Sequence, residues 1–175
     1  PESCLLTGMT PQICEERGIP ESEFAGEVWS RLNRPGTISI GYNTSGFDNE
    51  VARFLFWRNF LDPYSHQHRN GCSCWDLYPL VCAVWALRGD GIKWPLRKDV
   101  DPESNDEKSV SFRLECLSKA NGIVHAHSHE ALSDAMATLG LAALIRKTEP
   151  RLWKWALENR SREAVKACLL YTSDA

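Results

Sequence analysis

Asp48 is a carboxylate that the sequence places at the junction between a strand and a helix. It follows a predicted strand at 36–42 and a polar turn at 43–46, and it stands one residue into the next helix. A carboxylate at such a junction can point into a cleft beside the sheet edge, where α/β proteins bind ligands. The helix dipole alone also favours an Asp in the first turn. Spacing therefore leaves open a functional carboxylate and a plain helix-start residue.

His129 and Asp134 form a second candidate pair. A long helix is predicted to start near His129, and Asp134 follows five residues later, which corresponds to roughly 7.5 Å along a helix axis. Here the carboxylate could hold a divalent metal while the imidazole takes a proton from an attacking water. Asp134 also interrupts an apolar series, and a carboxylate beside a buried stripe needs a partner. A surface Asp with a helix-terminal His explains the same pattern.

A third cluster consists of His66, His68, Cys72 and Cys74. These residue types suit zinc, but their spacing matches no usual zinc finger and the predicted loop is short and polar. A zinc module is therefore the weaker hypothesis for this segment. The seven tryptophans could stack on nucleic-acid bases, although packing in the core or at its rim explains them equally well.

The elements that must position these residues alternate between helix and strand. The patterns predict a strand at 36–42, a loop at 62–73, a strand edge that leads into a helix within 74–87, and a long polar connection at 89–108. They also predict helices at 9–32 with a break at Pro20, 47–60, 111–120, 129–148 and within 150–168. This order predicts a three-layer α/β domain. Only one strand is convincing, and a sheet needs partners, so we expect the first strands to precede this chain.

The helix predicted at 47–60 carries an apolar stripe. Phe47, Val51, Phe54 and Leu55 stand at positions i, i+4, i+7 and i+8. This spacing puts them on one helical face, which predicts that they are buried together and that Asp48 lies on their flank.

Composition is that of a folded protein of one domain. The chain has 175 residues, of which 43% are hydrophobic and 25% are charged, and its net charge is −3. Residues 146–175 carry seven basic and four acidic side chains, which could touch phosphates or form a solvated face. No apolar run is long enough to span a membrane. Seven cysteines, an odd number, indicate reduced thiols in a cytoplasmic protein.

Two motifs together resemble one enzyme family. Residues 41–51 read GYNTSGFDNEV and resemble the second motif of the DEDDh 3′→5′ exonucleases, while HEALSD at 129–134 resembles their third motif, H-x-x-x-x-D. Segments at 6–12, 58–64, 75–77, 111–115 and 119–123 are most similar to the bacterial exodeoxyribonuclease I group of that family. The resemblance extends over residues 4–169.

The resemblance implies a ribonuclease-H-like α/β fold, here without its first strands, and removal of mononucleotides from the 3′ end of single-stranded DNA. Two Mg²⁺ ions, for which Mn²⁺ can substitute, would be held by four acidic side chains. By position, Asp48 and Asp134 would be two of these ligands and His129 the general base. We also expect substrate contacts from Asn43, Phe47 and Arg113. The implied protein is a monomer of the bacterial cytoplasm that acts in DNA repair and recombination and binds single-stranded-DNA-binding protein, with no membrane association.

The first acidic motif of the family, Asp-x-Glu, has no equivalent at its expected place. Residues 48–50 have this form but occupy the position of the second motif. We therefore expect residues 1–157 to be a partial exonuclease domain, 158–169 the start of a linker to a further domain, and 170–175 a non-native tail. With half of the metal ligands absent, this chain alone is expected to be inactive and poorly stable.

Other functions remain open at this point. One is a DEDDh ribonuclease or a proofreading exonuclease, against which the segments at 58–64 and 111–123 argue. Another is a catalytically dead module that binds single-stranded nucleic acid. An Asp-x-Glu motif on a strand before Pro1 would favour an enzyme over such a module.

Overall fold

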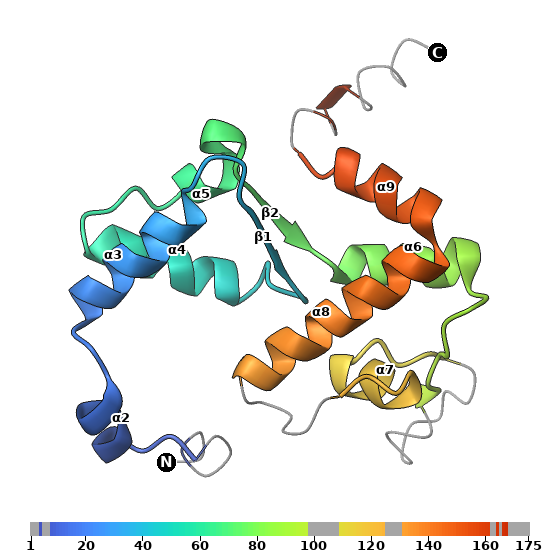
Figure 1. Ribbon diagram of the computed structural model, residues 1–175, viewed down its shortest axis with the longest axis horizontal. Coiled ribbons are helices and arrows are strands. Elements are labelled where there is room, and N and C mark those ends of the chain that lie inside the picture. The colour runs from blue at the N-terminus through green and yellow to red at the C-terminus, as the bar shows by residue number, and fades with distance from the viewer. Residues whose placement is uncertain are drawn as a thin grey trace. The chain divides into compact units, whose positions relative to one another are not determined.

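The computed structural model describes residues 4, 8–97, 109–124, 131–161, 164 and 166–167. Its contacts group into two compact units. Unit 1 consists of Pro1–Ile40 and Thr44–Trp75, and unit 2 of Gly41–Asn43 and Asp76–Ala175. Figure 1 shows the helices and strands that make up both units.

Unit 1 begins with two helices, α2 (Pro11–Arg17) and α3 (Glu21–Leu32). The hydroxyl of Thr10 caps α2 by accepting the N–H of Ile13 at 3.3 Å, and Pro11 occupies the first helical position. Pro20 then stands at the N-cap of α3. The predicted pair of helices with a break at Pro20 is confirmed.

Helix α4 (Asp48–Arg58) packs against α3. Ala25 of α3 and Phe56 of α4 are fully buried at this contact, and Leu55 is 8% exposed. Burying a Phe and a Leu side chain stabilises the pair by roughly 1.5–3 kcal/mol each. Trp29 adds a hydrogen bond to this packing, because its Nε1 donates to the carbonyl oxygen of Asp62 at 2.9 Å.

The apolar stripe expected on α4 is wrong in three of its four positions. Phe47, Val51 and Phe54 are 71%, 49% and 52% exposed, and only Leu55 is buried. Helix α4 has apolar side chains on two adjacent faces, and α3 packs on the face that carries Leu55 and Phe56. A helical period alone could not decide between these faces.

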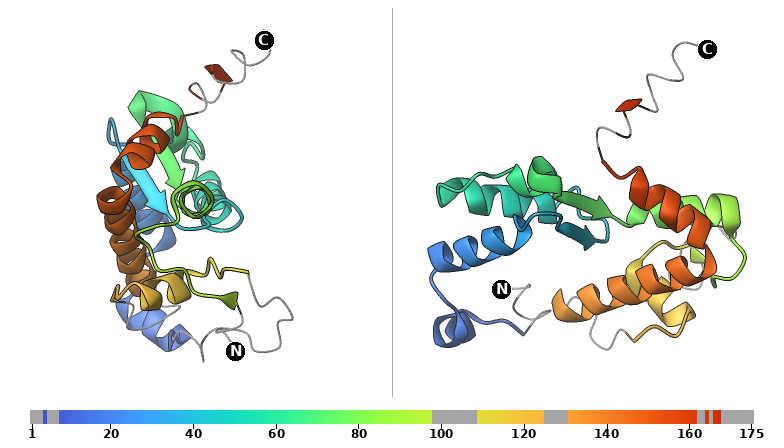
Figure 2. Two further views of the ribbon diagram at one scale, coloured as in Figure 1. Left: turned by 90° about the vertical axis from the view of Figure 1, so that its right-hand side faces the viewer. Right: turned by 45° about the horizontal axis from the view of Figure 1, so that its top comes forward.

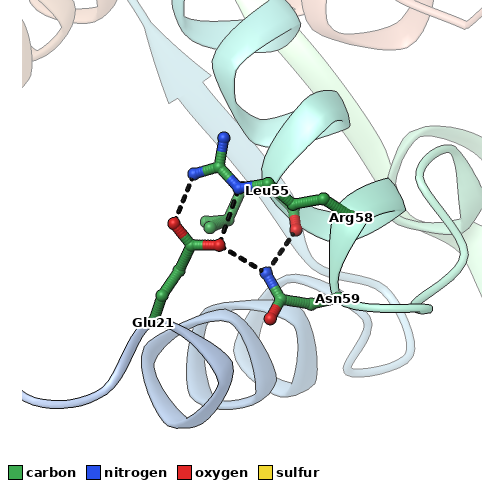
Figure 3. Close-up of polar contacts among 4 residues, drawn as sticks. All are labelled: Glu21, Leu55, Arg58 and Asn59. Carbon is green, nitrogen blue, oxygen red and sulfur yellow. Dashed lines mark hydrogen bonds and ion pairs between the residues drawn. The ribbon is translucent and has the colours of Figure 1, made fainter.

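Polar contacts also join the two helices (Figure 3). The guanidinium of Arg58 donates twice to the carboxylate of Glu21, with both distances 2.6 Å, and the amide of Asn59 donates to the same carboxylate at 3.0 Å. The hydrogen bond from Arg58 lowers the pKa of Glu21, with a further contribution from Asn59. Arg58 and Asn59 therefore have a structural role at the end of α4.

The segment predicted as a loop at 62–73 contains two short helices, α5 (Ser65–His68) and η1 (Arg69–Gly71), so that prediction is wrong. The carboxylate of Asp62 stabilises the start of α5, because its Oδ1 accepts the N–H groups of Tyr64 at 2.9 Å and of Ser65 at 3.1 Å. Elements of three or four residues are too short to show a helical period.

Strands β1 (Ile38–Gly41) and β2 (Ser73–Asp76) pair in parallel. The N–H of Ser73 donates to the carbonyl of Thr37 at 3.0 Å, and that of Leu77 donates to the carbonyl of Gly41 at 2.9 Å. The constant offset between the partners identifies the parallel register. The strand edge expected before the helix within 74–87 is therefore confirmed as β2, a second regular strand beside β1.

Unit 2 is mainly helical and consists of α6 (Tyr78–Arg88), α7 (Leu114–Ala120), α8 (Ala131–Thr148) and α9 (Pro150–Glu158). Helix α8 contacts α7 and α9, and α6 contacts α9 (Figure 2). The buried apolar side chains of this unit are Leu80, Val81, Val84, Ile92, Leu117, Ala137, Leu141, Ala142 and Ile145, with Leu77 before α6. Gly140 permits the close approach of α8 to Ile123, because a Cβ there would stand 2.5 Å from the Ile123 Cγ2.

The helices of unit 2 agree with the predictions in type and differ at their ends. Helix α7 begins at Leu114 because Arg113 is extended, so Phe112 is outside it. Helix α9 ends at Glu158. After α6, Leu96 and Val110 form an antiparallel β-bridge that the sequence did not indicate. No described helix combines the length and apolar character needed to cross a membrane.

Candidate active site

The carboxyl ends of β1 and β2 meet in unit 2, where Asn43 and Asp76 contact each other. Asp76 is the last residue of β2, and its Oδ1 accepts the N–H of Asn43 at 2.7 Å and the N–H of Tyr78 at 3.0 Å. Asn43 has a φ of 55°, a left-handed conformation that Asn tolerates better than most residues. Parallel α/β sheets commonly place their ligand sites at this end of the strands.

Tyr42 links the same end of β1 to the segment before α7. Its hydroxyl donates to the carbonyl oxygen of Phe112. Burial raises the pKa of this hydroxyl well above its ordinary value, with smaller contributions from Cys82 and Tyr78. The phenol therefore stays protonated and keeps donating at every physiological pH.

An aromatic cluster surrounds this hydrogen bond. The ring of Phe112 meets Tyr78, Trp85 and Trp94 in edge-on contacts, with centroid distances of 6.3, 5.6 and 6.2 Å. Tyr78 in turn meets Tyr42 at 5.7 Å. Aromatic contacts of this kind fix ring positions more tightly than aliphatic packing. The backbone that leads from Phe112 into α7 is thereby held beside the end of β1.

Arg113 directly follows this fixed backbone. It occupies the N-cap of α7, and its side chain is 66% exposed, with a weak ion pair to Glu115 at 3.9 Å. The structure thus brings two predicted substrate residues, Asn43 and Arg113, to one region of unit 2. Their link runs through Tyr42 and Phe112.

Asp48 and Phe47 lie at the start of α4 in unit 1. Asp48 is the first residue of the helix and is exposed, and Phe47 is its N-cap with 71% of its surface exposed. A hydrogen bond from the N–H of Asn49 to the carbonyl of Thr44, at 3.1 Å, closes the turn before the helix. Asp48 thus lies at the start of the helix that follows the strand and its connecting turn, as predicted.

Asp134 lies in the first turn of α8 in unit 2 and is half-buried. Its carbonyl oxygen accepts the buried hydroxyl of Thr138 at 2.8 Å. His129 lies outside the described residues. Among the residues that the structure describes, no three His, Cys, Asp or Glu side chains are grouped so that they could hold a metal ion.

The cluster at 66–74 does not form a zinc site within the described part of the chain. His66 is 3% exposed and packs edge-on against Phe56 at 5.4 Å. The thiol of Cys72 donates to the carbonyl of Arg34 at 3.2 Å, and the hydroxyl of Ser39 donates to the sulfur of Cys74 at 3.0 Å. Burial also raises the pKa of Cys74, which disfavours the thiolate that zinc needs.

The tryptophans are divided between packing and exposed positions. Trp75 is buried, and the indole of Trp94 donates to the carbonyl of Gly89 at 2.8 Å. Trp57, Trp85 and Trp155 are 67%, 45% and 60% exposed. Each of these three exposes enough ring surface for a base to stack on.

Two residues that organise the site were missed from the sequence, Asp76 and Tyr42. A carboxylate directly at the end of a strand was a usable signal for Asp76. Nothing in the spacing pointed to Tyr42, because its partner stands 70 residues later in the chain.

Comparison with known proteins gives one consistent result. No family model matches the chain. Exodeoxyribonuclease I of Haemophilus influenzae is 42% identical over 165 residues, which cover 94% of this chain and 33% of that protein. Exodeoxyribonuclease I of Escherichia coli is 40% identical over 169 residues, which cover 97% of this chain and 34% of that protein. The chain thus spans about one third of the length of these relatives.

Solved structures agree with the sequence comparison. The structure of exonuclease I from Methylocaldum szegediense matches with a TM-score of 0.85 at 40% identity and covers 97% of this chain and 34% of its own. E. coli exonuclease I in complex with a dA16 oligonucleotide matches with a TM-score of 0.84 at 39% identity, over 94% of this chain and 33% of its own.

Two further exonuclease I structures were solved with bound groups. One is a zinc-bound form of the complex of E. coli exonuclease I with single-stranded DNA, with a TM-score of 0.84 at 39% identity over 94% of this chain and 33% of its own. The other is an SSB/exonuclease I structure with the inhibitor CFAM, with a TM-score of 0.82 at 40% identity over 94% of this chain and 34% of its own. The ribonuclease-H-like α/β fold predicted from the sequence is confirmed by these matches, and the chain is homologous to about one third of bacterial exodeoxyribonuclease I.

Proposed function

We propose that this chain is part of a bacterial 3′→5′ exonuclease that removes mononucleotides from single-stranded DNA during repair and recombination. The observation that carries the proposal is the homology over nearly the whole chain to exodeoxyribonuclease I, including a relative solved with bound dA16. That complex favours DNA over the RNA substrate of a DEDDh ribonuclease. The chain would work in the bacterial cytoplasm as a monomer.

Asp48 and Asp134 are proposed as two ligands of a pair of Mg²⁺ ions, with Mn²⁺ as a substitute. The donor chemistry fits, because both are carboxylates, which hard divalent cations prefer, and Asp48 is exposed to an incoming ion. A zinc-bound form of the E. coli relative supports a metal-dependent reaction. When bound, the metal would offset the negative charge on the scissile phosphate.

Other side chains would accept the proton and contact the DNA. His129 would take the proton from the attacking water as general base. Arg113, with its exposed guanidinium, would contact a backbone phosphate. Phe47, with 71% of its surface exposed, would stack on a base, and Asn43 would contact the adjacent nucleotide. These contacts would hold the terminal phosphodiester in place for hydrolysis.

We propose that residues 1–157 belong to the exonuclease domain, that 158–169 start a linker, and that 170–175 are a non-native tail. The relatives are about three times as long, so the remaining ligands of the metal pair would come from outside this chain. This chain alone would therefore be inactive. A complex with single-stranded-DNA-binding protein is proposed by analogy with the SSB/exonuclease I structure.

Digestion of 3′-labelled single-stranded DNA with Mg²⁺ tests the proposal in the full-length protein. Wild type should release mononucleotides, and His129→Ala and Asp134→Ala should each reduce the rate by about 10²–10⁴-fold. Asp90→Ala, which removes an exposed carboxylate of unit 2, is the matched control and should retain full activity. An RNA of the same sequence should be degraded far more slowly.

The outcomes separate the alternatives. Equal digestion of RNA would favour a DEDDh ribonuclease. A wild-type protein that binds single-stranded DNA without degrading it would replace the enzyme by a binding module.

A further inference from the structure

The side chain of Asp76 accepts a hydrogen bond that a backbone carbonyl would accept in a regular β1–β2 ladder. In a regular parallel pair, a residue that donates to one strand position accepts the N–H two positions further along. Leu77 donates to the carbonyl of Gly41 at 2.9 Å, so its own carbonyl would be the regular acceptor for the N–H of Asn43. The structure has a different acceptor there, Oδ1 of Asp76, at 2.7 Å.

The start of α6 explains this exchange. Leu77 has helical dihedral angles as the N-cap residue of α6, and its carbonyl accepts the N–H of Val81 at 2.9 Å. The chain therefore leaves the sheet one residue too early to pair with Asn43. The same Oδ1 of Asp76 also accepts the N–H of Tyr78 at 3.0 Å, so one carboxylate oxygen satisfies the turn after β1 and the first turn of α6.

The bond from Asn43 has a consequence for the proposed site. Asn43 holds a φ of 55°, a conformation that costs a non-glycine residue free energy and persists only where the surroundings fix it. This residue turns the chain out of β1 into the segment that reaches Asp48 five positions later. The hydrogen bond to Asp76 anchors the beginning of that segment.

We propose that Asp76 is a positioning residue of the exonuclease site, which acts through the backbone of Asn43 and holds Asn43 in place for its contact with DNA. The inference rests on the proposed function. It assigns Asp76 a role as hydrogen-bond acceptor, which an Asn side chain can also fill through its amide oxygen.

Asp62 provides a matched control. Its Oδ1 also accepts two backbone N–H groups, from Tyr64 at 2.9 Å and from Ser65 at 3.1 Å, at the start of a helix. The two carboxylates therefore make the same kind of local cap, but Asp62 has no bond to the turn after β1. Loss of either cap should lower stability by a similar amount.

The experiment compares Asp76→Ala, Asp76→Asn, Asp62→Ala and wild type in the full-length protein. The KM for single-stranded DNA is measured with kcat, and thermal unfolding is measured in parallel. Asp76→Ala should raise KM by about 3- to 10-fold, the factor that corresponds to one lost hydrogen bond. Asp76→Asn should restore most of the wild-type KM, and Asp62→Ala should leave KM unchanged while lowering the unfolding temperature.

Two results would overturn the inference while the proposed function stands. The first is a wild-type KM for single-stranded DNA in an Asp76→Ala protein that unfolds as early as Asp62→Ala. The second is an Asp76→Asn variant as impaired as Asp76→Ala, which would assign the role to the negative charge. An inactive wild-type protein would overturn both the inference and the proposed function.

Discussion

Trp29 and Asp62 are joined by a hydrogen bond from the indole Nε1 of the first to the carbonyl oxygen of the second, at 2.9 Å. The two residues are 33 positions apart, so the bond connects the middle of α3 to the segment that follows α4. The same Asp62 caps α5 with its carboxylate. Asp62 thus accepts hydrogen bonds from Trp29 in α3, from Tyr64 before α5 and from Ser65 at the start of α5.

Substitution of Trp29 by Phe should destabilise the protein. The variant keeps an aromatic ring but leaves the Asp62 carbonyl without this donor, so we expect the free energy of unfolding to fall by about 1–2 kcal/mol. Urea unfolding measures the change. Trp57→Phe is the control, because Trp57 is 67% exposed, and it should stay within about 0.5 kcal/mol of wild type. Equal effects of both substitutions would contradict the role of the hydrogen bond.

Phe60→Gly should make the protein more stable. Phe60 has a φ of 59° and is 99% exposed, so its side chain has almost no burial to lose. The left-handed conformation costs an L residue about 1–2 kcal/mol, part of which the greater chain entropy of unfolded glycine offsets. We expect a gain of up to about 1 kcal/mol by urea unfolding. Phe60→Ala keeps the strained backbone and should show no gain in stability. A loss of unfolding free energy in Phe60→Gly would contradict this account, because the ring would then have a contact partner.

Protonation of His66 should destabilise unit 1 in mild acid. Burial lowers the pKa of His66 below its ordinary 6.5. The unfolded chain therefore binds a proton more readily than the folded one, and stability that is fully present above pH 6.5 decreases as the pH falls below it. His66→Phe should flatten the dependence of the unfolding free energy on pH in this range. His68→Gln, at an exposed position, removes only the smallest of the contributions to this pKa and should change the slope much less than His66→Phe.

Tyr42→Phe should weaken DNA binding as well as stability. The variant loses the hydrogen bond to Phe112, which we expect to cost about 1–2 kcal/mol of unfolding free energy. Because Arg113 follows Phe112, the KM for single-stranded DNA in the full-length protein should also rise. Tyr64→Phe, at a half-exposed ring, is the matched control and should change neither quantity. A stable Tyr42→Phe protein with a wild-type KM would contradict the link.

The sequence predicted helices well where their ends carry specific local signals. The predicted break at Pro20 separates α2 from α3, and α8 ends at Thr148, where the long helix was predicted to end. The short helix α5 was missed, because four residues show no period. The apolar stripe of α4 failed for a different reason, since the choice of buried face depends on where α3 packs.

The candidate site was predictable in its local parts only. Asp48 begins α4, as its spacing from the strand indicated, and Asp134 lies within the long helix predicted at 129–148. The contact of Asp76 with Asn43 was not predictable, because it depends on an early exit of β2 into α6 and on an N–H 33 positions away. Long-range hydrogen bonds of this kind leave no pattern in the neighbouring residues.

The β-bridge between Leu96 and Val110 has a practical consequence for engineering. The N–H of Arg97 donates to the carbonyl of Ser109 at 2.7 Å, and that of Ser111 donates to the carbonyl of Pro95 at 2.8 Å. These bonds hold the backbone of Arg97 beside that of Ser109 and the backbone of Pro95 beside that of Ser111. Trp94 and Phe112 flank these pairs and contact each other with ring centroids 6.2 Å apart, so the fluorescence of Trp94 can report whether a label attached at Arg97 or Ser109 has disturbed the fold.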